Sequence, residues 1–207
     1  MRFDLSLYLV TDPGLCAERG LAETVVAAVR GGVTLVQLRD KQASDGEMID
    51  QARRLKAALA GSGVPLIIND RLNVALESGA DGLHVGQDDG DVAAARAALG
   101  EEAILGLSVQ TPEQMARVDA ERLDYLGLGA VFATSSKRSR TRPLGFEGLA
   151  RLAATSPLPA VAIGGLRAEH AAAVHEAGAQ GLAVISAICG QPDPEAAARA
   201  FPLPGRN

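Results

Sequence analysis

Short apolar runs recur along the chain, and glycine, proline or polar residues bound each of them. Runs of this kind are typical of β-strands. Some of them, such as Leu66-Ile67-Ile68, have no polar position on either face, which is typical of parallel strands that are covered by helices. The pattern predicts eight strands, over residues 5–11, 33–39, 65–69, 82–87, 104–109, 125–132, 160–164 and 181–186.

Stretches rich in alanine, leucine, glutamate and arginine separate the apolar runs, and this composition favours helices. Glycines such as Gly32, Gly79 and Gly178 follow these stretches, where a glycine favours the left-handed end of a helix. The same unit of helix, turn and strand recurs at intervals of roughly 20 to 30 residues, which indicates one βα unit used many times. The clearest helices are predicted over residues 44–59, 112–121, 168–177 and 193–201.

Alternating strands and helices occur both in closed barrels and in open doubly wound sheets. A barrel of eight βα units needs roughly 200 to 250 residues, and this chain has 207. The first strand is not followed by the Gly-x-Gly-x-x-Gly turn that is typical of open dinucleotide-binding sheets. We therefore predict an α/β protein with a (β/α)8 TIM barrel, in which residues 1–207 form a single domain.

Composition narrows the classes of partner. The net charge of −5 lacks the basic excess that nucleic-acid and membrane-surface binders need, so neither partner is expected. The N-terminal apolar stretch lies between Asp4 and Asp12 and resembles neither a signal peptide nor a membrane span, and a cytoplasmic protein is expected. Cys16 and Cys189 show no metal-like spacing and are predicted to be buried, reduced thiols. The oligomeric state is left open, and a homo-oligomer is one of the states allowed.

Charged residues follow several predicted strands, and the carboxyl ends of barrel strands meet on the face where active sites of this fold lie. Arg39 and Lys41 follow the second strand, Asp70 the third, Asp89 the fourth and Lys137 the sixth. Arginine and lysine bind phosphates, and carboxylate oxygens suit Mg²⁺. The arrangement indicates a diphosphate bound together with Mg²⁺. The alternative is an ion-pair network of Arg39, Asp40, Lys41 and Asp70 that only stabilises the barrel rim.

A second anion site is predicted at the neighbouring strands. Gly164 and Gly165 end the seventh strand, and Ile185 and Ser186 end the eighth, at the place where many barrels bind phosphate through backbone N–H groups. The alternative is a tight turn that needs glycine only for its conformation.

The three histidines give little support for acid–base or nucleophilic chemistry. His170 and His175 are expected on a solvated helix surface, and His84 fits a core position as well as a site position. The sequence shows no arrangement typical of a Ser-His-Asp triad, so the chemistry is expected to be electrostatic.

Seven segments in order resemble thiamine-phosphate synthases, and the resemblance covers almost the whole chain from Leu7 to Phe201. Each segment lies at a predicted strand or its end, which makes the set far more specific than any one motif. The segments are LYLVTD at 7–12, VQLRDK at 36–41, INDR at 68–71, GLHVGQDD at 82–89, GLS at 106–108, AIGG at 162–165 and VIS at 184–186.

The resemblance implies a transferase that joins hydroxymethylpyrimidine diphosphate to thiazole phosphate, forming thiamine monophosphate and releasing diphosphate by a dissociative mechanism. It implies Mg²⁺ as the cofactor, held by Asp70 and Asp89. The pyrimidine diphosphate would be held by Gln37, Arg39, Lys41, Asn69, Ser108 and Lys137, of which Arg39, Lys41, Ser108 and Lys137 are the expected catalytic residues. The thiazole phosphate would be held by Thr134, Ser136, Gly165, Ile185 and Ser186.

Two positions depart from the family pattern, because Ala130 stands where the family has proline or histidine and Ser136 stands where it has threonine. A related thiazole tautomerase keeps the barrel, relies on a histidine after the sixth strand and lacks the metal residues. Ala130, Asp70 and Asp89 therefore argue against that isomerase. A non-catalytic barrel that binds a phosphate ligand is the other alternative, but it would not need the acidic pair.

Overall fold

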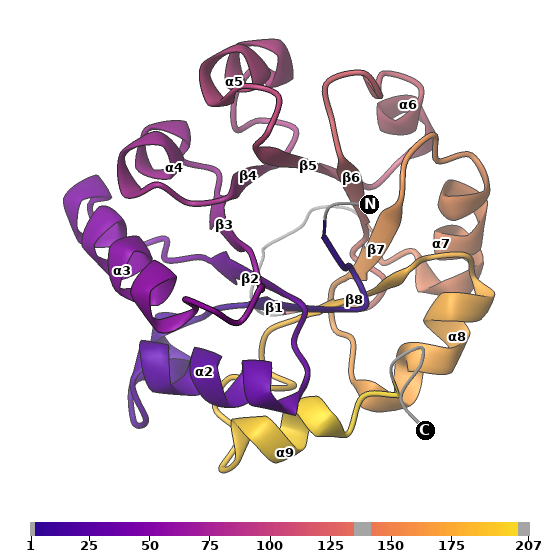
Figure 1. Cartoon of the computed structure of the whole chain (residues 1–207). Helices are drawn as coiled ribbons and strands as arrows, with labels where there is room; N and C mark the ends of the chain where they lie inside the picture. Colours follow the sequence, from indigo (N-terminus) through magenta and orange to yellow (C-terminus); the bar gives the residue numbers. More distant parts are fainter. Residues whose placement is uncertain (1–2, 135–141, 203–207) are drawn as a thin grey trace.

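The computed structural model describes residues 3–134 and 142–202, in which eight parallel strands pair in chain order and close into a barrel. Closure comes from the last strand, which pairs with both its predecessor and the first strand. Figure 1 looks into this barrel, with the helices in a ring around it. The predicted (β/α)8 TIM barrel is confirmed. The strands are β1 Leu7–Val10, β2 Leu35–Leu38, β3 Leu66–Asn69, β4 Gly82–Val85, β5 Ile104–Val109, β6 Tyr125–Leu128, β7 Ala160–Ile163 and β8 Gly181–Val184.

Helices follow the strands, and none in the two described ranges is long and apolar enough to cross a membrane. The predicted helix 44–59 is confirmed as α3. It begins after Ser44 because the side chains of Ser44 and Glu47 form a reciprocal capping box with each other's backbone N–H groups. Gly32 and Gly79 end their helices in the left-handed conformation, as predicted. The helices are α1 Pro13–Cys16, α2 Leu21–Gly31, α3 Asp45–Ala58, α4 Leu72–Ser78, α5 Val92–Leu99, α6 Pro112–Met115, α7 Gly145–Ala154, the 3₁₀ turn η1 Ala168–His170, α8 Ala171–Glu176 and α9 Pro194–Arg199.

Most predicted elements are longer than the observed ones, and two of them run at least four residues past the observed end. The helix predicted over 112–121 ends at Met115, because the chain then tightens into turns with hydrogen bonds between residues three apart, such as Val118 N to Met115 O at 3.1 Å. The strand predicted over 125–132 ends at Leu128. The segment beyond it still lies beside β7, since Phe132 N donates to Gly164 O at 3.1 Å.

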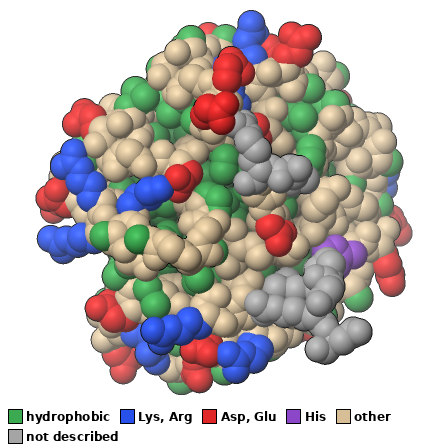
Figure 2. Space-filling model, viewed as in Figure 1, with side chains coloured by type: hydrophobic (Ala, Val, Ile, Leu, Met, Phe, Trp, Pro, Cys, Tyr) green, Lys and Arg blue, Asp and Glu red, His purple; other side chains and the backbone are tan. Residues whose placement is uncertain are grey.

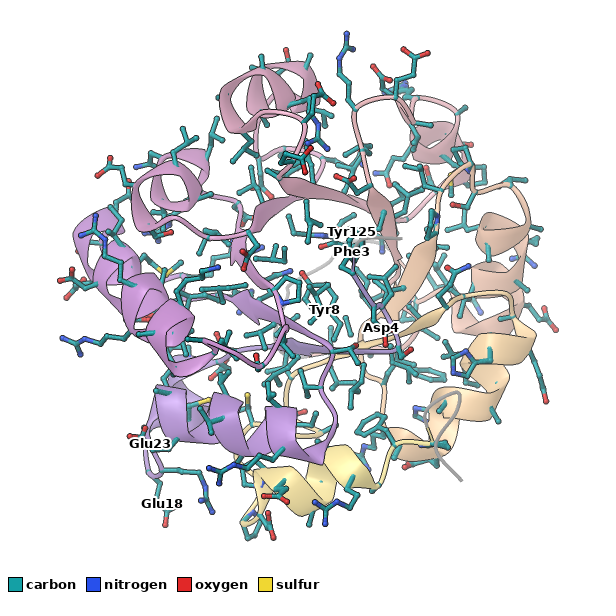
Figure 3. All side chains as sticks on the ribbon, in the orientation of Figure 1. Phe3, Asp4, Tyr8, Glu18, Glu23 and Tyr125 are labelled. Atoms are coloured by element: carbon teal, nitrogen blue, oxygen red, sulfur yellow. The ribbon has the colours of Figure 1, made fainter. Side chains whose placement is uncertain are left out.

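Side chains of the strands alternate between two apolar layers. The larger layer lies between strands and helices and also contains Cys16 and Cys189, which are buried free thiols as predicted. The second layer fills the barrel. Figure 3 labels three of its aromatic members, Phe3, Tyr8 and Tyr125, near the barrel centre. The N-terminal segment thus helps to fill the barrel before β1 begins.

Inward-facing positions change from apolar to polar along the strands. In β2, Leu35 belongs to the barrel core and Gln37 follows two residues later. In β3, Ile67 belongs to the same core and is followed by Asn69 at the strand end. Because side chains repeat their direction every two residues, this pattern carries polar groups to the carboxyl end of the barrel while apolar groups fill its interior. The fold therefore places the candidate site where the sequence predicts it.

A buried ion pair connects α5 with the start of β6. Arg96 is 7% exposed, and its guanidinium donates to Asp124 Oδ2 at 2.6 Å and to three carbonyl oxygens at 2.7–2.9 Å. Asp124 also accepts from the backbone N–H of Leu105 at 2.8 Å. Most charged groups are more exposed than this pair, and both signs are interspersed around the rim of the face in Figure 2.

Candidate active site

The floor of the candidate site consists of polar side chains at the carboxyl ends of neighbouring strands. Gln37 of β2 is 4% exposed and His84 of β4 is 7% exposed, whereas Asn69 of β3 and Ser108 of β5 are half-buried. Asn69 Nδ2 donates to Asp70 Oδ1 at 2.8 Å, and Ser108 Oγ lies 2.9 Å from His84 Nε2. The barrel therefore brings three of the predicted pyrimidine-site residues, Gln37, Asn69 and Ser108, to one end.

Asp70 and Asp89 meet beside Lys41, as the sequence predicts. Lys41 Nζ forms an ion pair with Asp70 Oδ2. Burial raises the pKa of Asp70, and the nearby Asp89 carboxylate raises it further, while Lys41 acts in the opposite direction. Asp70 also has a left-handed backbone with φ of 63°, and its N–H donates to His84 O at 2.8 Å. The site thus concentrates negative charge at a position that favours a cation.

The loop after β2 carries Lys41, and hydrogen bonds between the Asp40 side chain and the loop backbone stabilise it. The Asp40 carboxylate accepts from the N–H groups of Gln42 at 2.8 Å and Ala43 at 3.1 Å. Arg71 reaches over from the next loop and donates to Ala43 O at 2.7 Å and to Asp40 O at 3.3 Å. The rim network considered for Arg39, Asp40, Lys41 and Asp70 is therefore only partly present, since Asp40 binds backbone amides.

Arg71 is a positioning residue that the sequence analysis did not single out. Its guanidinium also pairs with Asp45 Oδ1 at 2.9 Å, and so it connects the β3 end to the start of α3. The signal available in the sequence was its place directly after Asp70, but the loop that it braces is 28 residues away. Arg39 itself is half-buried at the end of β2, where its N–H donates to Thr11 Oγ1 at 3.0 Å.

The predicted phosphate half lies where the ends of β6, β7 and β8 meet. Gly164 and Gly165 have φ angles of 95° and 68°, which side-chain-bearing residues rarely adopt. A Cβ on Gly165 would also come within 2.9 Å of Ala133 O, so the segment leading to Thr134 lies against this turn. Conformation and close approach therefore both account for the glycines, and the backbone remains open to a small anion because Gly165 is exposed.

Two of the remaining predicted phosphate residues, Ile185 and Ser186, follow β8 directly. Ile185 is half-buried after β8, and Ser186 is exposed, with its carbonyl accepting from Gln191 Nε2 at 2.8 Å. The expected helix after Gly165 begins only as the three-residue turn η1, preceded by Arg167. Ser136 and Lys137 lie outside the described residues.

Two histidines are not where the sequence analysis placed them. His170 is half-buried, with its ring centroid 4.9 Å from that of Phe132, and its Nδ1 accepts from Arg167 N at 3.1 Å. His175 is also half-buried, and its Nε2 is shielded from solvent. The expectation of fully solvated side chains was wrong for both, because His170 packs against the rings of Phe132 and Phe146, and His175 Nδ1 lies 3.2 Å from Ala179 O.

Known proteins share this fold and sequence over nearly its full length. The model of the family described as thiamine monophosphate synthase matches residues 7–188. A thiamine-phosphate synthase of Azorhizobium caulinodans is 54% identical over 197 residues, which cover 95% of this chain and 93% of that one. A thiamine-phosphate synthase of a Psychrobacter species is 52% identical, with 94% and 92% covered.

A solved structure agrees with these sequences. The thiamine phosphate pyrophosphorylase from Pyrococcus furiosus superposes with a TM-score of 0.86 at 34% identity, covering 97% of this chain and 95% of that one. The barrel, the charged residues gathered at its carboxyl end and these full-length matches agree, and the chain belongs to the thiamine monophosphate synthase family of transferases.

Proposed function

We propose that this transferase moves the pyrimidine-methylene group of hydroxymethylpyrimidine diphosphate to the ring nitrogen of thiazole phosphate, with Mg²⁺ as its cofactor. The bond between the methylene carbon and the diphosphate oxygen breaks first, and its electron pair leaves with diphosphate. The thiazole nitrogen then supplies the pair for the new carbon–nitrogen bond, which gives thiamine monophosphate. The contact of Lys41 with Asp70 beside Asp89, in a chain whose relatives are thiamine-phosphate synthases, carries this proposal.

The pair Asp70 and Asp89 suits Mg²⁺ better than a metal ion whose ligands must all be protein side chains. Within residues 3–134 and 142–202, no three His, Cys, Asp or Glu side chains form a metal-binding group. Mg²⁺ is commonly held by one or two carboxylates, several waters and substrate phosphates. Asp70 and Asp89 would hold the ion, and two carboxylates whose proximity raises the pKa of one gain from a shared cation. When bound, Mg²⁺ neutralises charge on the departing diphosphate.

The cationic residues have a separate task on the same leaving group. Lys41 and Arg39 follow one strand, and their positive charges would bind diphosphate oxygens and stabilise the charge that develops as the bond breaks. Lys41 is about half exposed and pairs with Asp70, so it already lies beside the proposed metal site. Lys137, which follows β6 in the sequence, would complete the set in the proposal.

The neutral residues Gln37, Asn69 and Ser108 would hold the pyrimidine ring. Ser108 Oγ lies 2.9 Å from His84 Nε2, a contact that in other enzymes activates a serine nucleophile. The other ring nitrogen of His84, however, lies 2.8 Å from the Tyr125 hydroxyl. A neutral phenol does not stabilise an imidazolium as the carboxylate of a triad does. We therefore expect Ser108 to contribute to catalysis by binding the substrate and not as a nucleophile, and we expect no covalent enzyme intermediate.

The thiazole phosphate would occupy the ends of β6, β7 and β8. Backbone N–H groups near Gly165 and Ser186, with the hydroxyls of Thr134 and Ser136, would donate to its phosphate oxygens. Gly165 is exposed, and the segment before Thr134 lies against it. The Gly165 N–H and the Thr134 hydroxyl would therefore reach the same small anion. Two adjacent anion sites are what a reaction between a diphosphate and a monophosphate requires.

The metal assignment is tested by turnover with and without Mg²⁺ in two variants. Asp70→Ala should abolish formation of thiamine monophosphate, and EDTA should do the same to the wild type. Asp88→Ala removes the carboxylate next to Asp89 in the chain and serves as the matched control, which should keep its activity. Activity in the presence of EDTA, or in folded Asp70→Ala, would contradict the role of the metal. Mass spectrometry that finds a stable adduct on Ser108 would contradict the dissociative scheme.

A further inference from the structure

A continuous chain of hydrogen bonds runs through the barrel interior and ends at two residues of the proposed pyrimidine site. Gln37 Nε2 donates to the Tyr8 hydroxyl at 2.6 Å, and the hydroxyls of Tyr8 and Tyr125 are 2.9 Å apart. The Tyr125 hydroxyl lies 2.8 Å from His84 Nδ1, and His84 Nε2 lies 2.9 Å from Ser108 Oγ. Five side chains from five strands are therefore joined in series.

The three middle members are buried, and the two tyrosines belong to the apolar core of the barrel. Tyr8 is 1% exposed, Tyr125 is fully buried and His84 is 7% exposed. Figure 3 labels both tyrosines near the centre of the barrel, with Phe3 beside them. Burial raises the pKa of both phenols, which therefore stay protonated and neutral. Hydroxyl groups in such surroundings must hydrogen-bond with each other or with neighbouring side chains.

Space for this chain is provided by glycine. A Cβ on Gly106 of β5 would lie 2.2 Å from Tyr125 Cζ and 2.6 Å from His84 Nδ1. A Cβ on Gly127 of β6 would lie 3.2 Å from His84 Cε1. The strands thus lack a side chain where the Tyr125 and His84 rings meet, which leaves room for the hydrogen bond between them.

The chain can run in only one direction at a time, because each hydroxyl has a single proton to donate. If Gln37 donates to Tyr8, then Tyr8 donates to Tyr125, Tyr125 donates to His84 Nδ1, and His84 Nε2–H donates to Ser108 Oγ. The Ser108 proton is then left to donate into the site, while Gln37 keeps its Oε1 as an acceptor. A reversed amide would reverse every link, so the hydrogen-bonding directions of Gln37 and Ser108 are coupled.

We propose that Tyr8, Tyr125 and His84 are positioning residues, which set the hydrogen-bonding direction of Gln37 and Ser108 toward the pyrimidine diphosphate. This inference rests on the proposed function for the identity of the ligand. In this role the three residues act through Gln37 and Ser108, the two ends of the chain, and not on the reacting atoms. A break in one link leaves the His84 tautomer and the Gln37 amide free to reorient, which weakens binding of the pyrimidine alone.

The test is calorimetric binding of hydroxymethylpyrimidine diphosphate to Tyr8→Phe, Tyr125→Phe and the double variant, with KM and kcat for both substrates. Each single variant should weaken pyrimidine binding about tenfold, the equivalent of one good hydrogen bond. The double variant should be no weaker than the singles, because both changes interrupt the same chain. The KM for thiazole phosphate should stay unchanged.

Thr24→Val is the matched control, since Thr24 is 1% exposed and its hydroxyl donates to Gly20 O at 2.7 Å, outside the chain. It should lower the melting temperature and leave pyrimidine binding unchanged. Unchanged binding in a folded single variant, a double variant about a hundredfold weaker, or equal weakening of both substrates would each overturn the proposal. Because either tyrosine alone breaks the chain, one folded variant is enough.

The same measurements separate this proposal from the proposed function. Wild-type protein that binds the pyrimidine diphosphate but forms no thiamine monophosphate refutes the proposed function, and the tyrosine variants still decide the role of the chain. Wild-type protein that does not bind the pyrimidine diphosphate at all overturns both.

Discussion

Replacing Asp70 with asparagine should remove activity and at the same time stabilise the protein. The raised pKa of Asp70 means that the folded state binds its proton more tightly than the unfolded chain does, through burial and through the neighbouring Asp89. The ionised carboxylate therefore destabilises the metal-free fold at neutral pH. Asparagine keeps the shape without the charge, and it tolerates the left-handed backbone at φ of 63° as well as aspartate does.

The size of the gain depends on burial of the carboxylate and on two opposing charge effects, repulsion from Asp89 and attraction to Lys41. Two unit charges about 4 Å apart repel by about 4 kcal/mol at the effective dielectric of a protein surface. Lys41 offsets most of this, although its side chain is 51% exposed and solvent screens its attraction. The free energy of unfolding of Asp70→Asn should therefore exceed that of the wild type by about 1 kcal/mol, within the range of other stabilising substitutions. For a chain of this length it raises Tm by about 2–4 °C.

The assay is thermal unfolding of wild type, Asp70→Asn and Asp70→Ala at several pH values without metal. Because the folded pKa is raised, the penalty is absent below the ordinary aspartate pKa of about 3.9 and grows as pH rises through the folded value. The advantage of Asp70→Asn should therefore be largest near pH 7 and vanish in acid. Asp70→Ala should gain less, because alanine in a left-handed conformation costs about 1–2 kcal/mol.

Ligand reverses the order of stability. Mg²⁺ with diphosphate at about 100 times Kd should stabilise the wild type by about 2.7 kcal/mol and leave Asp70→Asn nearly unchanged. An Asp70→Asn protein that is less stable than the wild type at neutral pH, or an advantage that grows in acid, would refute the electrostatic reasoning.

Five further substitutions, of which Arg122→Met and Gly46→Ala are the controls, test the fold and the second anion site. Arg96→Met should cost about 3 kcal/mol in chemical denaturation, because it removes the cation that offsets the largely buried Asp124 carboxylate. Arg122→Met at an exposed pair should cost less than about 1 kcal/mol. Gly106→Ala should destabilise by about 1–3 kcal/mol through overpacking, while Gly46→Ala in α3, where a Cβ meets open space, should stabilise by about 0.5–1 kcal/mol. Gly165→Ala should raise the KM for thiazole phosphate more than that for the pyrimidine diphosphate; equal effects on both would contradict the two-site division.

Much of the barrel could be predicted because periodicity and turn chemistry are local. The apolar run Leu66-Ile67-Ile68 and the Ser44 capping box each specify their element from a few neighbouring residues. Element lengths were less predictable. The helix after Pro112 stops early because tertiary packing, which no local pattern records, selects tighter turns after Met115.

In the candidate site, too, some features could be predicted from the sequence and others depend on tertiary contacts. Asp70 and Lys41 could be placed together because strand ends converge in this architecture, and the barrel bears that out. Contacts that cross the barrel could not be predicted, since Tyr8 and Tyr125 are 117 residues apart and read in sequence as ordinary core aromatics. The bracing of the Lys41 loop by Arg71 likewise depends on the register of two loops.

The central claim is that this barrel joins two substrates at a metal–diphosphate site. The most direct test is a single reaction of purified protein with hydroxymethylpyrimidine diphosphate, thiazole phosphate and Mg²⁺, followed by phosphorus NMR and chromatography. The account predicts thiamine monophosphate and free diphosphate in equal amounts, and neither product with Asp70→Ala. Diphosphate released without thiamine monophosphate, or a thiazole that is only isomerised, would contradict it.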